Sequence, residues 1–228
     1  PYGARIEDIV RKEGETLVIG FLSDCIDEAY APGADGLTAG VIGLLCDLLY
    51  DPYLQDGLFC AAYAEGERGN LIDRIAALKN DPRSWAPRRL NEIMCENEDY
   101  GKSALGTIEQ AERITSETLY AAYRRALSEA QVELFYCGTM MPDEVEAHFM
   151  ATPLAQPREG TLYQPHTVVQ ARPAGDVREV VEDAEVTQGK LSLGFRTGGA
   201  SLTGGEPAAY WMFQTIYGGS TSAKLFLN

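Results

Sequence analysis

The chain has 228 residues, of which 45% are hydrophobic and 23% are charged. This balance is too apolar for a disordered chain, and the length is sufficient to bury a core. The longest apolar runs fall far short of the roughly 20 residues that a membrane-spanning helix needs. The formal charge of -15, from 19 Lys and Arg against 34 Asp and Glu, would repel phosphates and anionic lipid headgroups, which argues against nucleic-acid and membrane partners.

The cysteines predict a reducing compartment. There are five of them, an odd number, and they form no CxxC pair: Cys25, Cys46, Cys60, Cys95 and Cys137. We therefore expect reduced, mostly buried thiols in a cytoplasmic protein. The N-terminus, Pro1-Tyr2-Gly3, shows neither an initiator Met nor the basic and apolar regions of a signal peptide, which is typical of an internal start.

The first 50 residues predict a β-hairpin followed by a helix. Ala4–Val10 and Glu15–Ser23 are rich in strand-forming residues, and Glu13-Gly14 supplies a turn between them. Apolar residues then recur between Val41 and Leu49 at i, i+3, i+4 and i+7, which predicts a helix that ends at Asp51-Pro52.

The middle of the chain predicts three helices. The first runs from about Gly57 to Lys79 and ends at the breaker Asn80-Asp81-Pro82. The second covers Ser84–Cys95, and Thr115 is a suitable N-cap for the third, Ser116–Ser128.

The segment that follows continues an interleaved α/β pattern. Gln131–Cys137 predicts a short strand ending at Gly138, and Pro142 suits the first turn of a helix over Asp143–Phe149. Between Ala151 and Ala174 no periodicity is sustained, and the prolines are dense enough to predict a linker: Pro153, Pro157, Pro165 and Pro173.

The last quarter predicts one strand and two helices. Lys190–Arg196 is an apolar strand and Pro207–Tyr217 is a helix. The turn Gly218-Gly219-Ser220 then precedes a helix over Ser222–Asn228.

Three stretches of sequence carry a resemblance to a known family. Tyr210–Tyr217 with the following Gly-Gly-Ser-Thr-Ser-Ala-Lys-Leu-Phe-Leu-Asn, the loop Tyr100–Gly106 and the helix start Ile114–Leu119 resemble insulinase-type (inverzincin) zinc peptidases. Asn80-Asp81, Arg88–Cys95 and Leu119–Tyr123 resemble a bacterial group of non-peptidase homologues that accompany an active paralogue.

The resemblance implies an α/β (α+β) fold, with a mixed, largely antiparallel sheet and helices on one face. Residues 1–150 would be the later part of the first insulinase-type repeat, 151–179 a proline-rich linker and 180–228 the truncated start of the second repeat. The opening elements of the second repeat could pack on the sheet of the first, within one chain or by exchange between two chains.

The resemblance also implies where zinc would bind in active relatives. They need His-x-x-Glu-His on a helix, and this chain lacks that motif, with His148 and His166 standing far apart. Their third ligand is a Glu seven residues after another acidic residue. Glu67 matches the acidic residue and Arg74 falls at the ligand position, where a guanidinium, which offers only donors, cannot coordinate zinc. Asp73 could substitute if the register slipped by one residue, but adjacent helix positions point about 100° apart, away from the expected ligand direction.

The expected site residues are therefore few. We expect no catalytic residue, no metal ligand and no cofactor in this chain, with Glu67 and Arg74 marking a degenerate zinc position. A charged, solvated helix face is the simpler interpretation of the same two residues. Gly218, Gly219 and Ser220 are candidates for the peptide cleft, although a lone glycine turn is a weak signal of ligand binding.

Three functions remain open from the sequence. The first is a catalytically inactive, peptidase-like subunit or scaffold that binds peptide, pairs with an active insulinase-type homologue or self-associates. The second is a zinc metalloendopeptidase whose HxxEH motif lies outside these residues. The third is a stand-alone module that pairs an extended peptide with a sheet edge.

Overall fold

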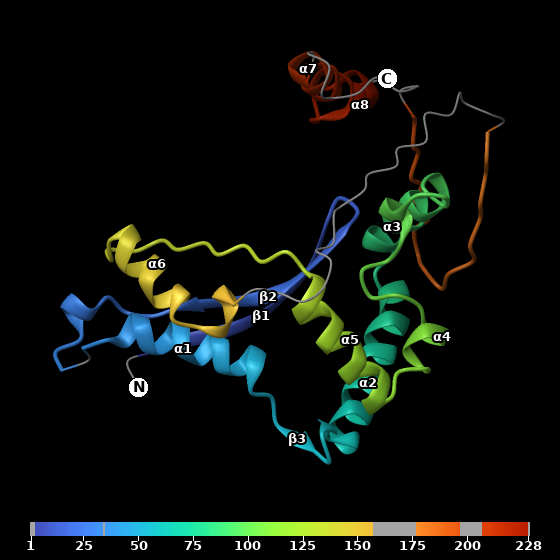
Figure 1. The fold of residues 1–228 in the computed structure, drawn as a ribbon. Coiled ribbons are helices and arrows are strands. Elements are labelled where there is room, and N and C mark those ends of the chain that lie inside the picture. The colour runs from blue at the N-terminus through green and yellow to red at the C-terminus, as the bar shows by residue number, and fades with distance from the viewer. Residues whose placement is uncertain (1–2, 34, 157–176, 197–206, 228) are drawn as a thin grey trace. The chain divides into compact units, whose positions relative to one another are not determined.

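The computed structural model describes residues 3–33, 35–156, 177–196 and 207–227 (Figure 1). The chain divides into two compact units, residues 1–167 and 168–228, and each is described by itself. The first unit contains two small antiparallel sheets and most of the helices. The structure is therefore α+β and mostly helical, which confirms the broad class expected from the sequence.

The predicted N-terminal hairpin is confirmed. β1 (Arg5–Glu13) pairs with β2 (Thr16–Asp24) in an antiparallel register that places Glu13 opposite Thr16. The turn begins at Gly14, whose φ of 60° lies in the left-handed region that glycine adopts without steric cost. The cross-strand pair Val10 and Ile19 remains 53% and 70% exposed, so the hairpin adds little to the core.

A small apolar core lies between two helices of the first unit. α1 (Leu37–Tyr50) buries Ile42 and Cys46, which are one turn apart, and it packs against α6 (Pro142–Met150), which buries Val145. The helix predicted around residues 41–49 and its end at Asp51 are confirmed, as is the helix that begins with Pro142.

A second hairpin replaces the predicted start of the long helix. β3 (Leu54–Gln55) pairs with β4 (Leu58–Phe59), and the turn between them is Asp56-Gly57, with φ values of 51° and 78°. The expectation of a helix from Gly57 is wrong by four residues, because Asp-Gly favours a two-residue hairpin turn over helix initiation.

The remaining helices of the first unit agree closely with the sequence patterns, except for one short helix over residues 108–111 that the sequence did not predict. They are α2 (Ala61–Ala77), α3 (Pro82–Met94), the short α4 (Ile108–Ala111) and α5 (Ser116–Glu129), with 3-10 turns at Glu28–Tyr30, Leu78–Asn80, Asp99–Gly101 and Pro153–Ala155. Thr115 caps α5 as predicted, since its hydroxyl accepts a hydrogen bond from the Thr118 amide at 3.3 Å.

An aromatic cluster joins α5 to the elements before it. The Phe59 ring meets Tyr120 and Tyr123 edge-on, at centroid distances of 5.6 and 5.3 Å. The Tyr123 hydroxyl also donates to the Leu49 carbonyl at 2.5 Å, which ties α5 to the last turn of α1. These aromatic side chains therefore pack against one another.

Two predicted strands do not form a ladder. Residues 131–137 and 190–196 are assigned to no strand, and among the described residues they pair with no sheet. Phe135 is 94% exposed and Leu191 is 83% exposed. A strand-forming sequence needs a partner strand to satisfy its backbone, and the described residues supply none, so the mixed sheet with helices on one face is not formed by these residues.

The second unit is described over residues 177–196 and 207–227. α7 (Pro207–Gly218) agrees with the predicted helix, and α8 (Lys224–Leu227) is shorter than the predicted Ser222–Asn228, of which Asn228 lies outside the described residues. The structure describes only part of the predicted linker, since residues 157–176 lie outside it. None of the described helices is long and apolar enough to cross a bilayer.

Candidate functional site

The residues predicted to mark a degenerate zinc position lie on α2. Glu67 and Arg74 are seven residues apart in one regular helix, so they share a face, whereas Asp73 points about 100° away from Arg74. All three side chains are exposed. The Glu67 carboxylate accepts a hydrogen bond from the Asn70 amide at 3.3 Å.

These residues do not fit a zinc ion. The Arg74 guanidinium carries a permanent positive charge and has no lone pair to give to a metal. On the same helix, Arg68 forms an ion pair with Glu65 at 2.6 Å. The face around Glu67 is therefore a mixed-charge helix surface, and we derive no catalytic step through a metal.

The two histidines are far from this face in sequence and do not add to it. His148 is half-buried in the last turn of α6, and His166 lies outside the described residues. Within residues 3–33, 35–156, 177–196 and 207–227, no three His, Cys, Asp or Glu side chains come together as a metal-binding group.

The peptide-cleft candidates form the turn after α7 in the second unit. The Gly219 amide donates to the Thr215 carbonyl at 3.2 Å, and a Cβ at Gly219 would lie 2.8 Å from the Thr215 Cα. Only glycine permits this close approach. The Ser220 hydroxyl lies 2.9 Å from the Ser222 hydroxyl. The turn thus has a structural reason for its glycine, and its predicted role at a peptide cleft stays a prediction.

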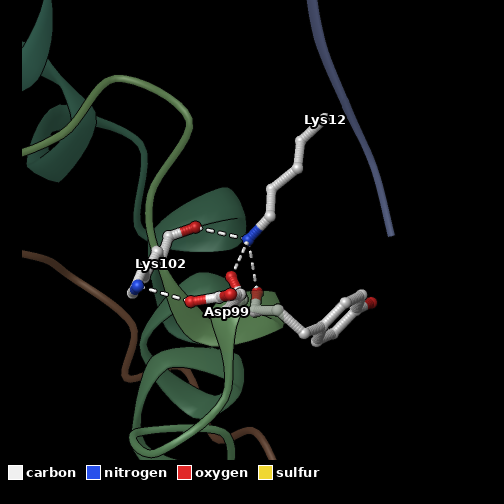
Figure 2. A network of polar contacts seen from close by, with 4 residues as sticks. Lys12, Asp99 and Lys102 are labelled. Carbon is white, nitrogen blue, oxygen red and sulfur yellow. Dashed lines mark hydrogen bonds and ion pairs between the residues drawn. The ribbon is translucent and has the colours of Figure 1, made fainter. Parts of the chain in front are cut away.

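A contact that the sequence did not reveal holds the tip of the β1–β2 hairpin, and we call it the hairpin-tip contact (Figure 2). The Lys12 ammonium donates to three backbone carbonyls, those of Asp99, Tyr100 and Lys102, at 2.8, 2.6 and 2.6 Å. It also lies 5.5 Å from the centroid of the Tyr100 ring. An ammonium has three donors, so these carbonyls use all of them.

Charged neighbours complete the hairpin-tip contact. The Asp99 carboxylate forms an ion pair with Lys102. A hydrogen bond from the Lys102 ammonium to this carboxylate, together with the positive charge of Lys102, holds the pKa of Asp99 below its usual value. Partial burial lowers the pKa of Lys12, and the carboxylates of Asp99 and Glu15 oppose that shift.

A pocket lies beside the hairpin-tip contact, and we call it the tip pocket. Its volume is about 400 Å³. Its walls come from the hairpin turn and from the loop after the 3-10 turn at residues 99–101: Lys12, Glu15, Thr16, Leu17, Asp99, Lys102, Ser103 and Ala104. The Oε2 atom of Glu15 is shielded from solvent and has no hydrogen-bond partner among the described residues.

Sequence reasoning missed Lys12 and Glu15 because nothing local marks them. Lys12 lies 87 to 90 residues from the carbonyls that it contacts. Glu15 occurs in an ordinary charged turn, next to the ion pair of Arg11 with Glu13 at 2.5 Å. No residue pattern in the sequence indicates the hydrogen bonds of Lys12 or the shielded carboxylate oxygen of Glu15.

The chain is similar to a known protein among curated sequences. The chain is 29% identical over 228 residues to YmfF of Bacillus subtilis (strain 168), which is described as a probable inactive metalloprotease. The match covers 100% of this chain and 52% of the relative, so the chain spans about half the length of that protein. No family model matches the chain.

A solved structure is also similar to this chain. The crystal structure of a conserved protein from Enterococcus faecalis V583 matches with a TM-score of 0.64 and 25% sequence identity, covering 74% of this chain and 40% of that one. The chain is therefore a homologue of a probable inactive metalloprotease, in agreement with the inactive, peptidase-like resemblance recognised in the sequence.

Proposed function

We propose that this homologue of a probable inactive metalloprotease is part of a catalytically inactive, peptidase-like protein that serves as a subunit or scaffold. In this proposal it contributes shape to a peptide-holding assembly, either with an active insulinase-type homologue or with a second copy of itself. Residues 1–150 would then belong to the first insulinase-type repeat, with its larger mixed sheet, and residues 180–228 would open the second.

The observation that carries the proposal is Arg74 on the same helical face as Glu67. A cation at the ligand position repels zinc, and a guanidinium is permanently charged, so that repulsion is always present. The similarity to YmfF, a probable inactive metalloprotease, supports the same conclusion. Asp73 does not rescue the position, because its side chain points away from the shared face of the helix.

The first experiment measures zinc content and peptide cleavage of the full-length protein. We expect less than stoichiometric zinc by elemental analysis and no hydrolysis of a denatured polypeptide. Asp73→Ala should leave both results unchanged. One zinc per chain together with polypeptide hydrolysis in the parent protein would refute the proposal and would favour a metalloendopeptidase whose HxxEH motif lies elsewhere.

The second experiment separates the assembly roles. Light scattering of the full-length protein, alone and mixed with a purified active homologue, should show a complex of two chains in at least one case. A monomer under both conditions would contradict the subunit role. If that monomer binds an extended peptide by itself, the stand-alone peptide-binding module becomes the better interpretation.

A further inference from the structure

Two exposed tyrosines lie side by side where the β3–β4 hairpin leads into α2, and we call them the tyrosine pair (Figure 1). Tyr53 directly precedes β3 and Tyr63 lies in the first turn of α2, and their side chains are 66% and 69% exposed. Their ring centroids are 6.5 Å apart, with the ring planes tilted by 49°. The side-chain amide of Gln55 donates to the Tyr53 hydroxyl at 3.1 Å, which orients that ring. The pair is therefore a formed aromatic surface that is largely open to solvent.

Two carboxylates accompany the tyrosine pair. Glu67 lies one turn after Tyr63 on the same face of α2, and Asp56 is in the turn between β3 and β4. Both side chains are exposed, and neither forms an ion pair within the part of the chain that the structure describes. Arg68, the nearest basic residue in the sequence, is paired with Glu65 instead. The aromatic surface therefore carries negative charge that no described side chain neutralises.

The stretch of chain that contains the tyrosine pair is strongly acidic. Residues 13–67 include eleven Asp and Glu residues and no Lys or Arg, in a chain whose formal charge is -15. This stretch forms β2, α1, the β3–β4 hairpin and the start of α2. A surface with one sign of charge raises the local concentration of oppositely charged partners. Charge complementarity therefore favours a cationic partner for the tyrosine pair.

From these observations, we propose that the tyrosine pair, together with Asp56 and Glu67, is a docking surface for a polypeptide segment that carries arginine side chains. The faces of tyrosine rings attract cations, and the planar guanidinium of arginine also stacks on them. The same guanidinium can donate two parallel hydrogen bonds to a carboxylate. Tyrosine is common at protein interfaces because it offers a large, rigid contact area. This inference names the partner class for the peptide-holding role proposed above, and its biological meaning rests on that role.

The chemistry of the surface distinguishes this partner from the alternatives. A polyanion such as a nucleic acid would meet unpaired carboxylates. An apolar segment would cover those carboxylates without giving them a hydrogen bond, which is costly. A metal ion needs several converging ligands, and the described residues contain no group of three His, Cys, Asp or Glu side chains that could hold one. Arginine is favoured over lysine because an ammonium is more strongly hydrated and has no planar face to stack.

The test titrates the full-length protein with short peptides, by NMR in a low-salt buffer. The probes are acetylated and amidated tetrapeptides made of arginine, of lysine or of glutamine. We expect the arginine peptide to bind with a dissociation constant on the order of 0.1 mM, the lysine peptide to bind roughly threefold more weakly, and the glutamine peptide not to bind. Salt at about 1 M, where the Debye length is about 3 Å, should weaken binding of the arginine peptide.

One pair of variants tests the rings. Replacing both tyrosines with leucine, Tyr53→Leu with Tyr63→Leu, should weaken binding of the arginine peptide roughly tenfold, because it removes the two ring faces and keeps apolar side chains. Tyr53→Phe with Tyr63→Phe is the matched control. Phenylalanine keeps the rings, so this protein should bind the peptide within about twofold of the parent.

A second pair of variants tests the charges. Asp56→Asn with Glu67→Gln should weaken binding of the arginine peptide roughly fivefold, because it removes both carboxylates and keeps their shape. Asparagine also tolerates the φ of 51° at position 56, so the β3–β4 turn is retained. Asp8→Asn is the control, since Asp8 is exposed on β1, outside the hairpin and helix that carry the tyrosine pair, and it should change the affinity less than twofold.

Several results would overturn the proposal. These are the absence of binding by the arginine peptide, equally tight binding of the lysine peptide, equal affinities of the leucine and phenylalanine variants, and equal weakening by Asp8→Asn and by the double charge variant. The last result would show that the peptide responds to diffuse surface charge rather than to the tyrosine pair. Zinc content, peptide cleavage and light scattering do not depend on these side chains. If those measurements refute the inactive subunit while arginine binding still requires the rings, only the proposed function fails.

Discussion

Replacing Lys12 with Met tests how firmly the β1–β2 hairpin is held by its tip. Met keeps most of the unbranched side chain and removes the ammonium, so the substitution deletes three hydrogen bonds and the cation–π contact with Tyr100. The two hairpin strands pack mainly on each other, which makes this contact an important link between the hairpin and the helices of the first unit.

The magnitude follows from the number of bonds and their exposure. A hydrogen bond from a charged donor contributes about 1.5–3 kcal/mol when it is buried. The three bonds of Lys12 lie in an exposed setting, where water replaces much of what is lost. We therefore expect a total cost of about 1–2 kcal/mol, which corresponds to a roughly 5–30-fold increase in local opening.

The assay is native-state hydrogen exchange of the loop that carries the carbonyls. The amides of Gly101 and Lys102 donate to the carbonyls of Glu98 and Asp99 at 3.0 and 3.1 Å, so their protection reports on the order of this turn. Lys12→Met should reduce that protection. Arg11→Met is the matched control, because Arg11 is exposed on the same strand and contacts Glu13 instead.

An unchanged protection factor in Lys12→Met, or an equal loss in Arg11→Met, would refute the reasoning. Lys12→Arg gives a finer test of the geometry. The guanidinium of arginine is planar and holds its N–H donors in a rigid fork. It therefore cannot donate to the three carbonyls in the arrangement that the ammonium uses. This variant should therefore recover only part of the protection.

Three further predictions concern stability of the first unit. Thr115→Ala should lower the free energy of unfolding by about 0.5–2 kcal/mol in urea titrations, because it removes the N-cap of α5, whereas Thr115→Ser should be nearly neutral. Ile42→Ala should cost about 2–5 kcal/mol by the same measurement, and Leu44→Ala on the exposed face of α1 should cost far less, so equal effects would contradict the assigned core. Hydrogen bonds from the Ser84 hydroxyl and a backbone amide lower the pKa of Asp81 in the folded state, so its contribution is present above the ordinary pKa of about 3.9 and is lost as the pH falls through the lower folded value. Asp81→Asn should flatten that acidic part of the urea-midpoint profile, and an unchanged profile would contradict the assignment.

Local signals in the sequence determined most helix positions and the first hairpin. Thr115 ahead of a helical pattern predicted a cap that the structure contains, and Pro142 predicted the start of α6. Gly14 predicted the hairpin turn. These predictions succeeded because caps and turns depend on side chains and backbone angles within four or five residues. Asp56-Gly57 carried the same kind of local signal for a second turn.

The resemblance to insulinase-type peptidases also came from the sequence, through short motifs such as Ile114–Leu119 and the glycine turn after α7. The placement of Arg74 on the Glu67 face followed from helical periodicity alone, because seven residues return to the same side of a helix. The structure adds that both side chains are exposed.

Only the tertiary structure decided the hairpin-tip contact and the tip pocket. Lys12 donates hydrogen bonds to carbonyls 87 to 90 residues away. Every residue has a backbone carbonyl, so the sequence does not indicate which carbonyls a lysine will contact. Residues 131–137 are a second case that the sequence alone does not decide. Their apolar pattern gives strand propensity, yet a strand exists only where a second backbone satisfies its hydrogen bonds, and the described residues provide none. Propensity is a property of a segment, whereas pairing is a property of the whole fold.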